Sequence, residues 1–199
     1  MHQSSFEKMS AFKDRYLKSF QGAPLKILDL GSQDVNGTYR PIFNDPNWTY
    51  IGVDLAPGNN VDIVLDNPYK WTAVKTESID IVVSGQAFEH IEFFWLTMLE
   101  IARVLKPGGT VCIIAPAAGV EHRHPVDCWR FYADGMRALA KFARLDINEV
   151  STEWNPPQYA DGGQIWKDSV LIAFKRQNGL REKIYTFLLS TLLRRSSNT

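Results

Sequence analysis

Short apolar runs recur along the first 117 residues, and this recurrence constrains the fold more than any other feature of the sequence. The runs are LKILDL (25–30), TYIGVDL (49–55), VDIVL (61–65), SIDIVVS (78–84) and TVCIIAPA (110–117). Several of them are nearly continuous in β-branched residues, as is typical of parallel strands buried on both faces. Longer segments with helical spacing alternate with the runs. The chain therefore predicts an α/β fold with an open, doubly wound, mostly parallel sheet.

Helical spacing is clearest in two segments. Residues 4–20 predict a helix, in which Ser4 and Glu7 have the spacing of a capping box. Residues 91–105 carry apolar side chains on one helical face, and the following Lys-Pro-Gly-Gly predicts the end of that helix.

The C-terminal part of the domain predicts an antiparallel pair. DINEVSTEW (146–154) and SVLIAFKR (169–176) both have strand character, and the Pro- and Gly-rich segment between them leaves no room for a helix. We expect a hairpin at the edge of the sheet. The loops at 116–134 and 155–168 are the longest insertions, so we expect them to form most of the acceptor pocket.

Composition limits the domain count and the class of partner. The chain has 199 residues, of which 45% are hydrophobic, enough for one sizeable core. We therefore predict a single domain at 1–176 and a separate tail at 177–199. Lys and Arg number 22, as do Asp and Glu, so no basic field favours a nucleic acid. The sequence shows no signal segment and no run of about 18 apolar residues, which predicts a cytoplasmic protein.

The tail predicts an amphipathic helix. LREKIYTFLLSTLLRR (180–195) places Leu180, Ile184, Phe187, Leu188 and Leu192 on one face, with Lys and Arg elsewhere. Such a helix packs on its own domain or on a second copy in a homodimer. The alternative is an interfacial helix in peripheral contact with the inner face of an anionic membrane.

Polar residues follow four of the strands, at the sheet edge where open α/β folds bind ligands. Those of interest are Asp29, Gly31, Ser32 and Gln33; Asp54 and Leu55; Asp66 and Asn67; and Ser84 and Gln86. Gly31 allows a ligand close to the backbone, and we expect a helix N-terminus after this turn to receive a negative group. Asp54 can accept both hydroxyls of a ribose. Gln33 stands where a dinucleotide site needs its second glycine, so S-adenosylmethionine, with an amino acid in place of phosphates, fits better than a dinucleotide.

The motifs LDLG, GVDL, SxxxFEHI and ARVLKPGGT occur in this order, and with them the sequence resembles the class I S-adenosylmethionine-dependent methyltransferases, particularly the type 11 family. The resemblance implies a Rossmann-like sheet, S-adenosyl-L-methionine as cofactor and S-adenosyl-L-homocysteine as product. It also implies that Asp29 and Gly31 line the methionine end, that Asp54 holds the ribose, and that Asp66 lies near the adenine. Gln86 and His90 would face the sulfonium. Gln33 departs from the family pattern, and we expect a longer turn in which Gly37 supplies the flexibility.

The segment EHRHPVDCWRFY (121–132) follows the fifth strand, at the edge where the methyl group would be presented. It is similar to a block in bacterial methyltransferases of surface-glycan pathways, which implies a role in polysaccharide biosynthesis. We therefore expect O-methylation of a small molecule such as a sugar or glycan precursor. A histidine suits removal of a hydroxyl proton near pH 7, and the candidates are His90, His122 and His124, with Asp127 orienting one of them.

Less specific interpretations stay open for these residues. His122 and His124 are as compatible with bonding the loop backbone as with catalysis. Arg130 with Asp127 is more typical of a structural ion pair than of an anion site. The trio of His122, His124 and Asp127 has no thiolate pair and is a weak metal signal, so we predict no metal. Two other functions also remain: a nicotinamide-dependent oxidoreductase, and a non-catalytic adenosyl-binding partner subunit.

Overall fold

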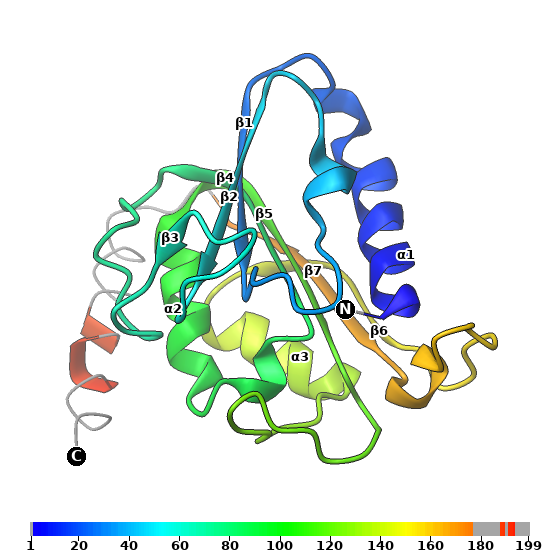
Figure 1. Ribbon diagram of the computed structural model, residues 1–199. Helices are drawn as coiled ribbons and strands as arrows, with labels where there is room; N and C mark the ends of the chain where they lie inside the picture. The colour runs from blue at the N-terminus through cyan, green and yellow to red at the C-terminus, as the bar shows by residue number, and fades with distance from the viewer. Residues whose placement is uncertain (1, 177–187, 190, 194–199) are drawn as a thin grey trace.

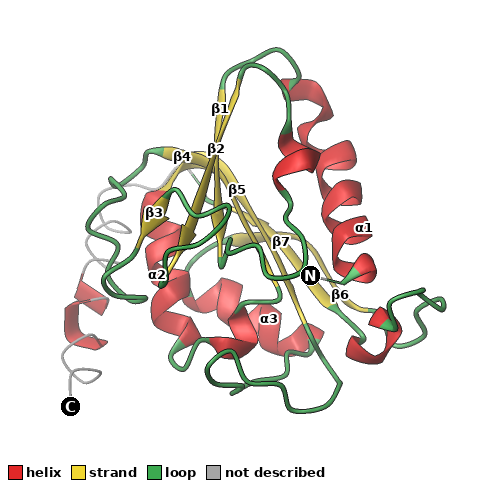
Figure 2. Ribbon diagram, viewed as in Figure 1, coloured by secondary structure: helices red, strands yellow, loops and turns green. Residues whose placement is uncertain are grey.

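A seven-stranded sheet forms the centre of the computed structural model, which describes residues 2–176, 188–189 and 191–193 (Figures 1 and 2). The strand order is β3-β2-β1-β4-β5-β7-β6. The bounds are β1 Leu25–Leu30, β2 Trp48–Asp54, β3 Ile63–Val64, β4 Ile79–Gly85, β5 Leu105–Ala115, β6 Asp146–Thr152 and β7 Ser169–Phe174. The strands β1 to β5 pair in parallel, whereas β7 runs antiparallel to both β5 and β6. This is the predicted doubly wound sheet with its C-terminal antiparallel pair.

Helices cover both faces of the sheet (Figure 1). The helix α1 (Gln3–Phe12) continues through a π-helical turn at Lys13–Leu17 and a 3-10 turn at Lys18–Phe20. It packs on one face, in a cluster with the inward side chains of the central strands. The helices α2 (Phe94–Val104) and α3 (Ala133–Phe142) pack on the other face. Because both faces are covered, most residues of β1, β4 and β5 are buried and apolar.

Two predictions about helix starts are wrong. The expected capping box is absent, because Ser4 Oγ donates to Asp168 (2.7 Å) and the helix begins at Gln3 without a side-chain cap. No helix follows Gly31: the link to β2 contains only a 3-10 turn at Arg40–Phe43. Asp34 Oδ1 accepts a bond from the backbone of Gly37 (2.7 Å), and this local turn competes with helix formation.

The turn after β1 uses both of the glycines that the sequence singled out. Gly31 and Gly37 both have positive φ angles, +77° and +121°. A side chain at either position would be strained in this conformation. The turn therefore reaches β2 as an extended loop and leaves its backbone groups near the end of the sheet.

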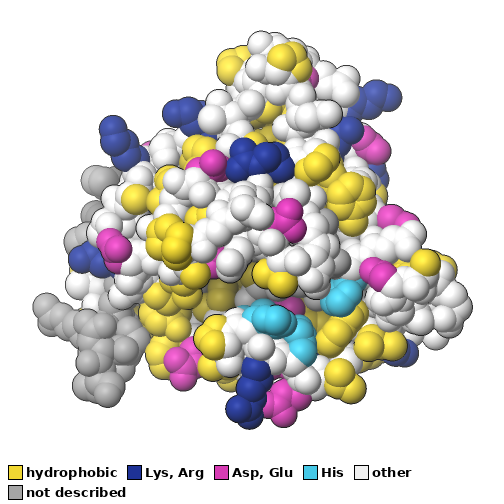
Figure 3. Space-filling view, viewed as in Figure 1, with side chains coloured by type: hydrophobic (Ala, Val, Ile, Leu, Met, Phe, Trp, Pro, Cys, Tyr) yellow, Lys and Arg dark blue, Asp and Glu magenta, His cyan; other side chains and the backbone are white. Residues whose placement is uncertain are grey.

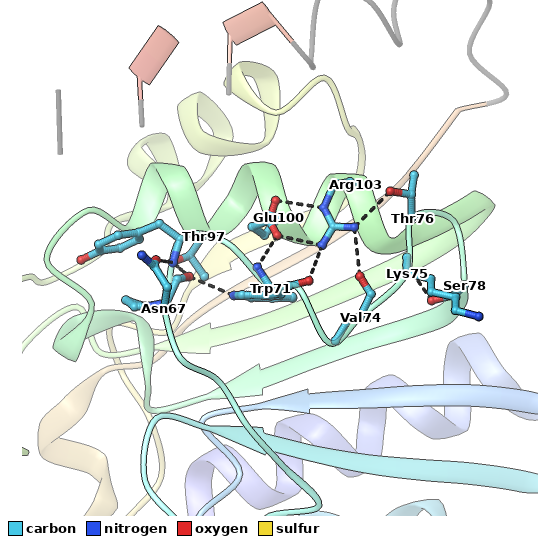
Figure 4. A network of polar contacts seen from close by, with 11 residues as sticks. Asn67, Trp71, Val74, Lys75, Thr76, Ser78, Thr97, Glu100 and Arg103 are labelled. Atoms are coloured by element: carbon cyan, nitrogen blue, oxygen red, sulfur yellow. Dashed lines mark hydrogen bonds and ion pairs between the residues drawn. The ribbon is translucent and has the colours of Figure 1, made fainter. Parts of the chain in front are cut away.

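A polar network ties the loop after β3 to α2 (Figure 4). Arg103 donates to Glu100 on its own helix (2.8 and 3.0 Å) and to the carbonyls of Trp71 (2.9 Å) and Val74 (3.0 Å). Glu100 in turn accepts from the backbone of Trp71 (2.7 Å). The loop that closes one side of the sheet edge is thereby fixed to the core.

The tail falls mostly outside the described residues. On the apolar face predicted for the tail, Leu180, Ile184 and Phe187 lie outside the described residues. Leu188 and Leu192, from the same face, are exposed. Leu189 and Leu193 pack against the main core cluster instead. Among the described residues, no helix combines the length and apolar character needed to cross a bilayer.

Candidate functional site

A cavity of about 650 Å³ opens at the carboxyl edge of the parallel strands, where the space-filling view is hollowed and histidine side chains gather (Figure 3). The pairing of β1 with β2 and β4 sets Asp29 beside Gly52 and Val83, so the segments that follow these three strands lie side by side. The lining includes ten of the predicted site residues: Asp29, Gly31, Ser32, Gln33, Asp54, Leu55, Gln86, His90, His122 and His124. One cavity therefore unites the predicted cofactor side with the predicted acceptor side.

Asp29 is a buried carboxyl on the cavity wall. Tyr50 donates its hydroxyl hydrogen to Oδ2, whereas Oδ1 has no hydrogen-bond partner among the described residues. Burial raises the pKa of Asp29 to about 7, although the bond from Tyr50 opposes this rise. The unpartnered oxygen leaves Asp29 able to receive a donor such as the ammonium group of an amino acid.

Asp54 ends β2 and holds the turn after β1. Its Oδ2 accepts from the backbone of Gln33 (3.0 Å), and its Oδ1 accepts from the backbone of Leu55 (2.7 Å). Each carboxylate oxygen has a second lone pair. The carboxylate is therefore fixed in orientation and retains one acceptor position per oxygen, which suits the two hydroxyls of a ribose.

The side chains of Ser32 and Ser84 donate hydrogen bonds to backbone carbonyls around the turn after β1. Ser32 Oγ donates to the carbonyl of Asn60 (3.2 Å), and Ser84 Oγ donates to the carbonyl of Leu30 (2.9 Å). Ser84 is fully buried and outside the cavity lining. Its hydroxyl thus supports the end of β1 from β4.

Gln86 has a positive φ of 56° just after β4. Its Nε2 donates to Asp168 (2.9 Å), and its Oε1 has no hydrogen-bond partner among the described residues. The side chain is therefore held at the cavity by Asp168, and its carbonyl oxygen is buried without a partner among the described residues.

Asp66 and Asn67 lie just outside the cavity lining, which instead includes their neighbours Leu65 and Pro68. Asp66 is exposed. Asn67 Oδ1 accepts from the backbone of Tyr69 (2.7 Å), so its side chain stabilises a local turn. The structure does not bring these two residues together with the rest of the predicted site.

Three histidine rings form an edge-to-face group at the cavity. The ring centroids of His90 lie 4.9 Å from His122 and 5.7 Å from His124, and those of His122 and His124 lie 6.0 Å apart. His90 Nδ1 is 2.6 Å from the carbonyl oxygen of Val126. Because a carbonyl only accepts, this contact assigns the proton to Nδ1 and leaves the lone pair on Nε2. Burial lowers the pKa of His90, which favours the neutral ring.

Asp127 orients this group without lining the cavity. Arg130 binds it through both carboxylate oxygens (2.6 and 2.9 Å), and the backbone of His122 donates to Oδ2 (2.7 Å). The Arg130 guanidinium holds the pKa of Asp127 well below its ordinary value. The Arg130–Asp127 contact is therefore an ion pair within the protein, the less specific of the two interpretations. His122 Nδ1 lies 3.3 Å from Asp127 Oδ2.

Glu89 connects β4 to the histidine loop. Its carbonyl accepts from the backbones of Cys128 (2.7 Å) and Trp129 (3.2 Å), which sets the loop against the end of β4. Its side chain is fully buried, and neither carboxylate oxygen has a hydrogen-bond partner among the described residues. Burial raises the pKa of Glu89 to about 8.

Sequence reasoning missed several cavity residues. His2 and Tyr39 line the cavity, and Trp166 reaches it from the predicted acceptor loop at 155–168. Trp166 stacks on His2 (5.1 Å between ring centroids) and contacts His122 (4.5 Å). Nothing in the sequence around a tryptophan in a long loop predicts that it will line a cavity.

Comparison with known proteins agrees with this geometry. Residues 28–113 match the family model described as Methyltransferase domain. No match was found among curated proteins.

Solved structures also share the architecture. The 1,6-didemethyltoxoflavin N1-methyltransferase of Burkholderia thailandensis, solved with S-adenosylhomocysteine, has a TM-score of 0.66 at 16% identity over 88% of this chain and 80% of that chain. A phosphoethanolamine N-methyltransferase of Haemonchus contortus, solved with S-adenosyl-L-methionine, has a TM-score of 0.57 at 18% identity over 77% and 49%. The cyclase SpnF has a TM-score of 0.66 at 14% identity over 88% and 82%. At these identities the likeness shows the fold.

The matched segment and the fold define the class of protein. The sheet is that of the class I methyltransferases, and the match covers the strands whose ends form the cofactor side of the cavity. The match to a methyltransferase domain supports an S-adenosylmethionine-dependent methyltransferase, and the solved structures that share the fold include one in complex with S-adenosyl-L-methionine. The match favours this class over a nicotinamide-dependent oxidoreductase.

Proposed function

We propose that the enzyme methylates a hydroxyl group of a small molecule, with a sugar or glycan precursor as the acceptor. The observation that carries this proposal is the group of three histidine rings in the same cavity as Asp29 and Asp54. S-adenosylmethionine supplies the methyl group and its own leaving group. The protein therefore has to position the acceptor and take up the hydroxyl proton.

The contacts of the histidines support the proton-accepting role. His90 keeps a free lone pair on Nε2 because Nδ1 donates to a backbone carbonyl. His124 is exposed and lies at the cavity, where an acceptor reaches it. An amine acceptor that arrives unprotonated needs no such base, whereas a hydroxyl must lose its proton during transfer.

Polar side chains are set in a cavity wall that is mostly apolar. Asn36, Thr38 and Arg123 line the cavity together with the histidines. Such groups can hydrogen-bond the hydroxyls of a sugar, while the apolar part of the wall can pack on the faces of its ring.

A turnover assay tests the proposal. Purified protein, S-adenosylmethionine and panels of sugar nucleotides, small phenols and amines are assayed for S-adenosylhomocysteine release. We expect turnover with a hydroxyl acceptor, and a loss of turnover in at least one of His90→Ala, His122→Ala and His124→Ala. Turnover with amines alone, or full activity in all three variants, would refute the proposed chemistry.

We further propose a cytoplasmic location, with the tail in contact with a second copy of the chain or an anionic membrane. The exposed Leu188 and Leu192 support such a contact. A pelleting assay with anionic vesicles and a sedimentation measurement distinguish the two partners. Deletion of residues 180–199 is expected to abolish the contact that is present.

A further inference from the structure

Glu89, His90 and His122 form a cluster that the methyl transfer itself does not explain. Each offers one ligand atom, and these three atoms lie within 4.8 Å of one another. Glu89 and His90 belong to the 3-10 turn Phe88–His90 after β4, and His122 comes from the loop after β5. The cluster differs from the His122, His124 and Asp127 trio that the sequence suggested as a weak metal signal.

The carboxylate of Glu89 is the feature that needs a partner. It is fully buried, and both of its oxygens lack a hydrogen-bond partner among the described residues. A buried carboxylate is unfavourable unless a cation or several donors satisfy it. Arg130 acts on Glu89 at a distance without a hydrogen bond to it: its terminal nitrogens bond to Asp127 and backbone carbonyls, and its Nε has no hydrogen-bond partner among the described residues.

His90 has the supporting hydrogen bond that metal ligands use, and His122 has a carboxylate nearby, although its Nδ1 makes no hydrogen bond among the described residues. Metal-binding histidines usually donate their second ring nitrogen to a carbonyl or carboxylate, which fixes the ring and its tautomer. His90 Nδ1 donates to the carbonyl of Val126 (2.6 Å) and leaves Nε2 free, 3.7 Å from Glu89 Oε1. His122 Nδ1 faces the carboxylate of Asp127 at 3.3 Å, which would hold that ring in the same way.

We propose that Glu89, His90 and His122 bind one divalent transition-metal ion, with Zn²⁺ as the best match. Two imidazoles and a carboxylate suit Zn²⁺ and its neighbours better than Mg²⁺, which prefers oxygen ligands. Ligands of a tetrahedral zinc ion lie about 3.3 Å apart. The cluster is somewhat wider, so binding requires small rotations of the side chains.

The position of the cluster gives the ion a role at the acceptor. His90 and His122 line the cavity, and three protein ligands leave at least one coordination position open. An acceptor hydroxyl that takes this position is more acidic than in water. In that arrangement His90 Nε2 binds the ion and no longer accepts the proton, so His124 is the histidine that remains to take it up. This role rests on the proposed function, whereas metal binding itself does not.

Metal binding is tested with the full chain after treatment with a chelator. Isothermal titration with Zn²⁺ alone is expected to show one ion per chain, and Mg²⁺ is expected to bind far more weakly. His122→Ala and Glu89→Gln are each expected to weaken Zn²⁺ binding by more than about 100-fold, beyond the loss seen when only a supporting partner is removed. His124→Ala is the matched control from the same loop and is expected to keep the Zn²⁺ affinity.

S-adenosylhomocysteine binding, measured on each variant, shows that the variants fold. Zn²⁺ binding that is absent, or that survives both His122→Ala and Glu89→Gln in folded protein, would overturn the proposal. Because no acceptor is present in these titrations, a failure of the proposed O-methylation does not alter their outcome. A positive titration together with amine-only turnover would keep the metal site and reject the hydroxyl acceptor.

Discussion

Asp29→Asn is expected to make the folded protein more stable at alkaline pH. Asp29 is 2% exposed, and its pKa is raised from 3.8 to about 7 by burial. A carboxyl whose pKa is higher in the folded state binds a proton more tightly there than in the unfolded chain. Its stabilising contribution is therefore complete below about pH 4 and is lost as the pH rises through about 7. Asparagine keeps an oxygen that can accept from Tyr50 but never ionises.

The magnitude follows from the two pKa values. They differ by about three, and a tenfold change in a proton equilibrium corresponds to about 1.4 kcal/mol, so ionising Asp29 in the fold costs about 4 kcal/mol at most. Most of this cost appears between pH 5 and pH 8. Over that interval the unfolding free energy of Asp29→Asn should rise by about 3 kcal/mol relative to the parent protein.

Urea unfolding at pH 5, 6, 7 and 8 measures this difference directly. Other groups that titrate in the same range, Glu89 among them, are present in both proteins and cancel in the comparison. The cofactor is left out, because an ammonium group near Asp29 would stabilise its charged form. A difference that is flat with pH, or that falls as the pH rises, would show that Asp29 is not a strained buried acid.

The turn and the strand ends give two further predictions. Gly31→Ala should lose about 2 kcal/mol in unfolding free energy, because its Cβ would lie 2.4 Å from Cβ of Ala87. Gly108→Ala is the control in urea unfolding, because φ is also positive there (+84°) but an added Cβ would have no atom within 4 Å. An equal loss of unfolding free energy in the two variants would contradict the steric argument. Asp54→Asn should weaken S-adenosylhomocysteine binding by about 10- to 100-fold in calorimetry, since a bond to a charged group contributes about 1.5–3 kcal/mol. Asp66 lies outside the cavity lining, so Asp66→Asn should bind S-adenosylhomocysteine with the affinity of the parent protein. Equal losses of affinity in the two variants would show that the ribose does not bind at Asp54.

The sheet was predictable because its strands are buried on both faces. Continuous β-branched runs such as IVV in β4 leave few alternatives, and the antiparallel pair of β6 and β7 followed from the absence of helical spacing between them. The helix α3 was missed. Only Met136, Leu139 and Ala140 of its ten residues are buried, and Gly135 weakens its propensity.

The site residues were predictable where they directly follow the end of a strand. Asp29, Gly31 and Asp54 are placed by the register of β1 with β2, so their sequence positions were enough. Trp166 and His2 reach the cavity because segments far apart in the sequence pack together, and no local sequence pattern predicts that packing. Glu89 was visible next to His90, but its unpartnered carboxylate depends on how the histidine loop closes over it.

The position of Gln33 explains how a chain with only part of the usual glycine pattern retains the cofactor site. Its backbone donates to Asp54, and its side chain packs so closely on Gly58 that a Cβ there would lie 2.7 Å from Nε2. Gln33 therefore joins the turn after β1 to the loop after β2, a contact that glycine could not make. The bond to Asp54 comes from the backbone, so any residue except proline at position 33 could make it, whereas the packing on Gly58 requires the glutamine side chain. A side chain at this position disfavours the close backbone approach that a pyrophosphate needs, and an amino-acid tail needs that approach less.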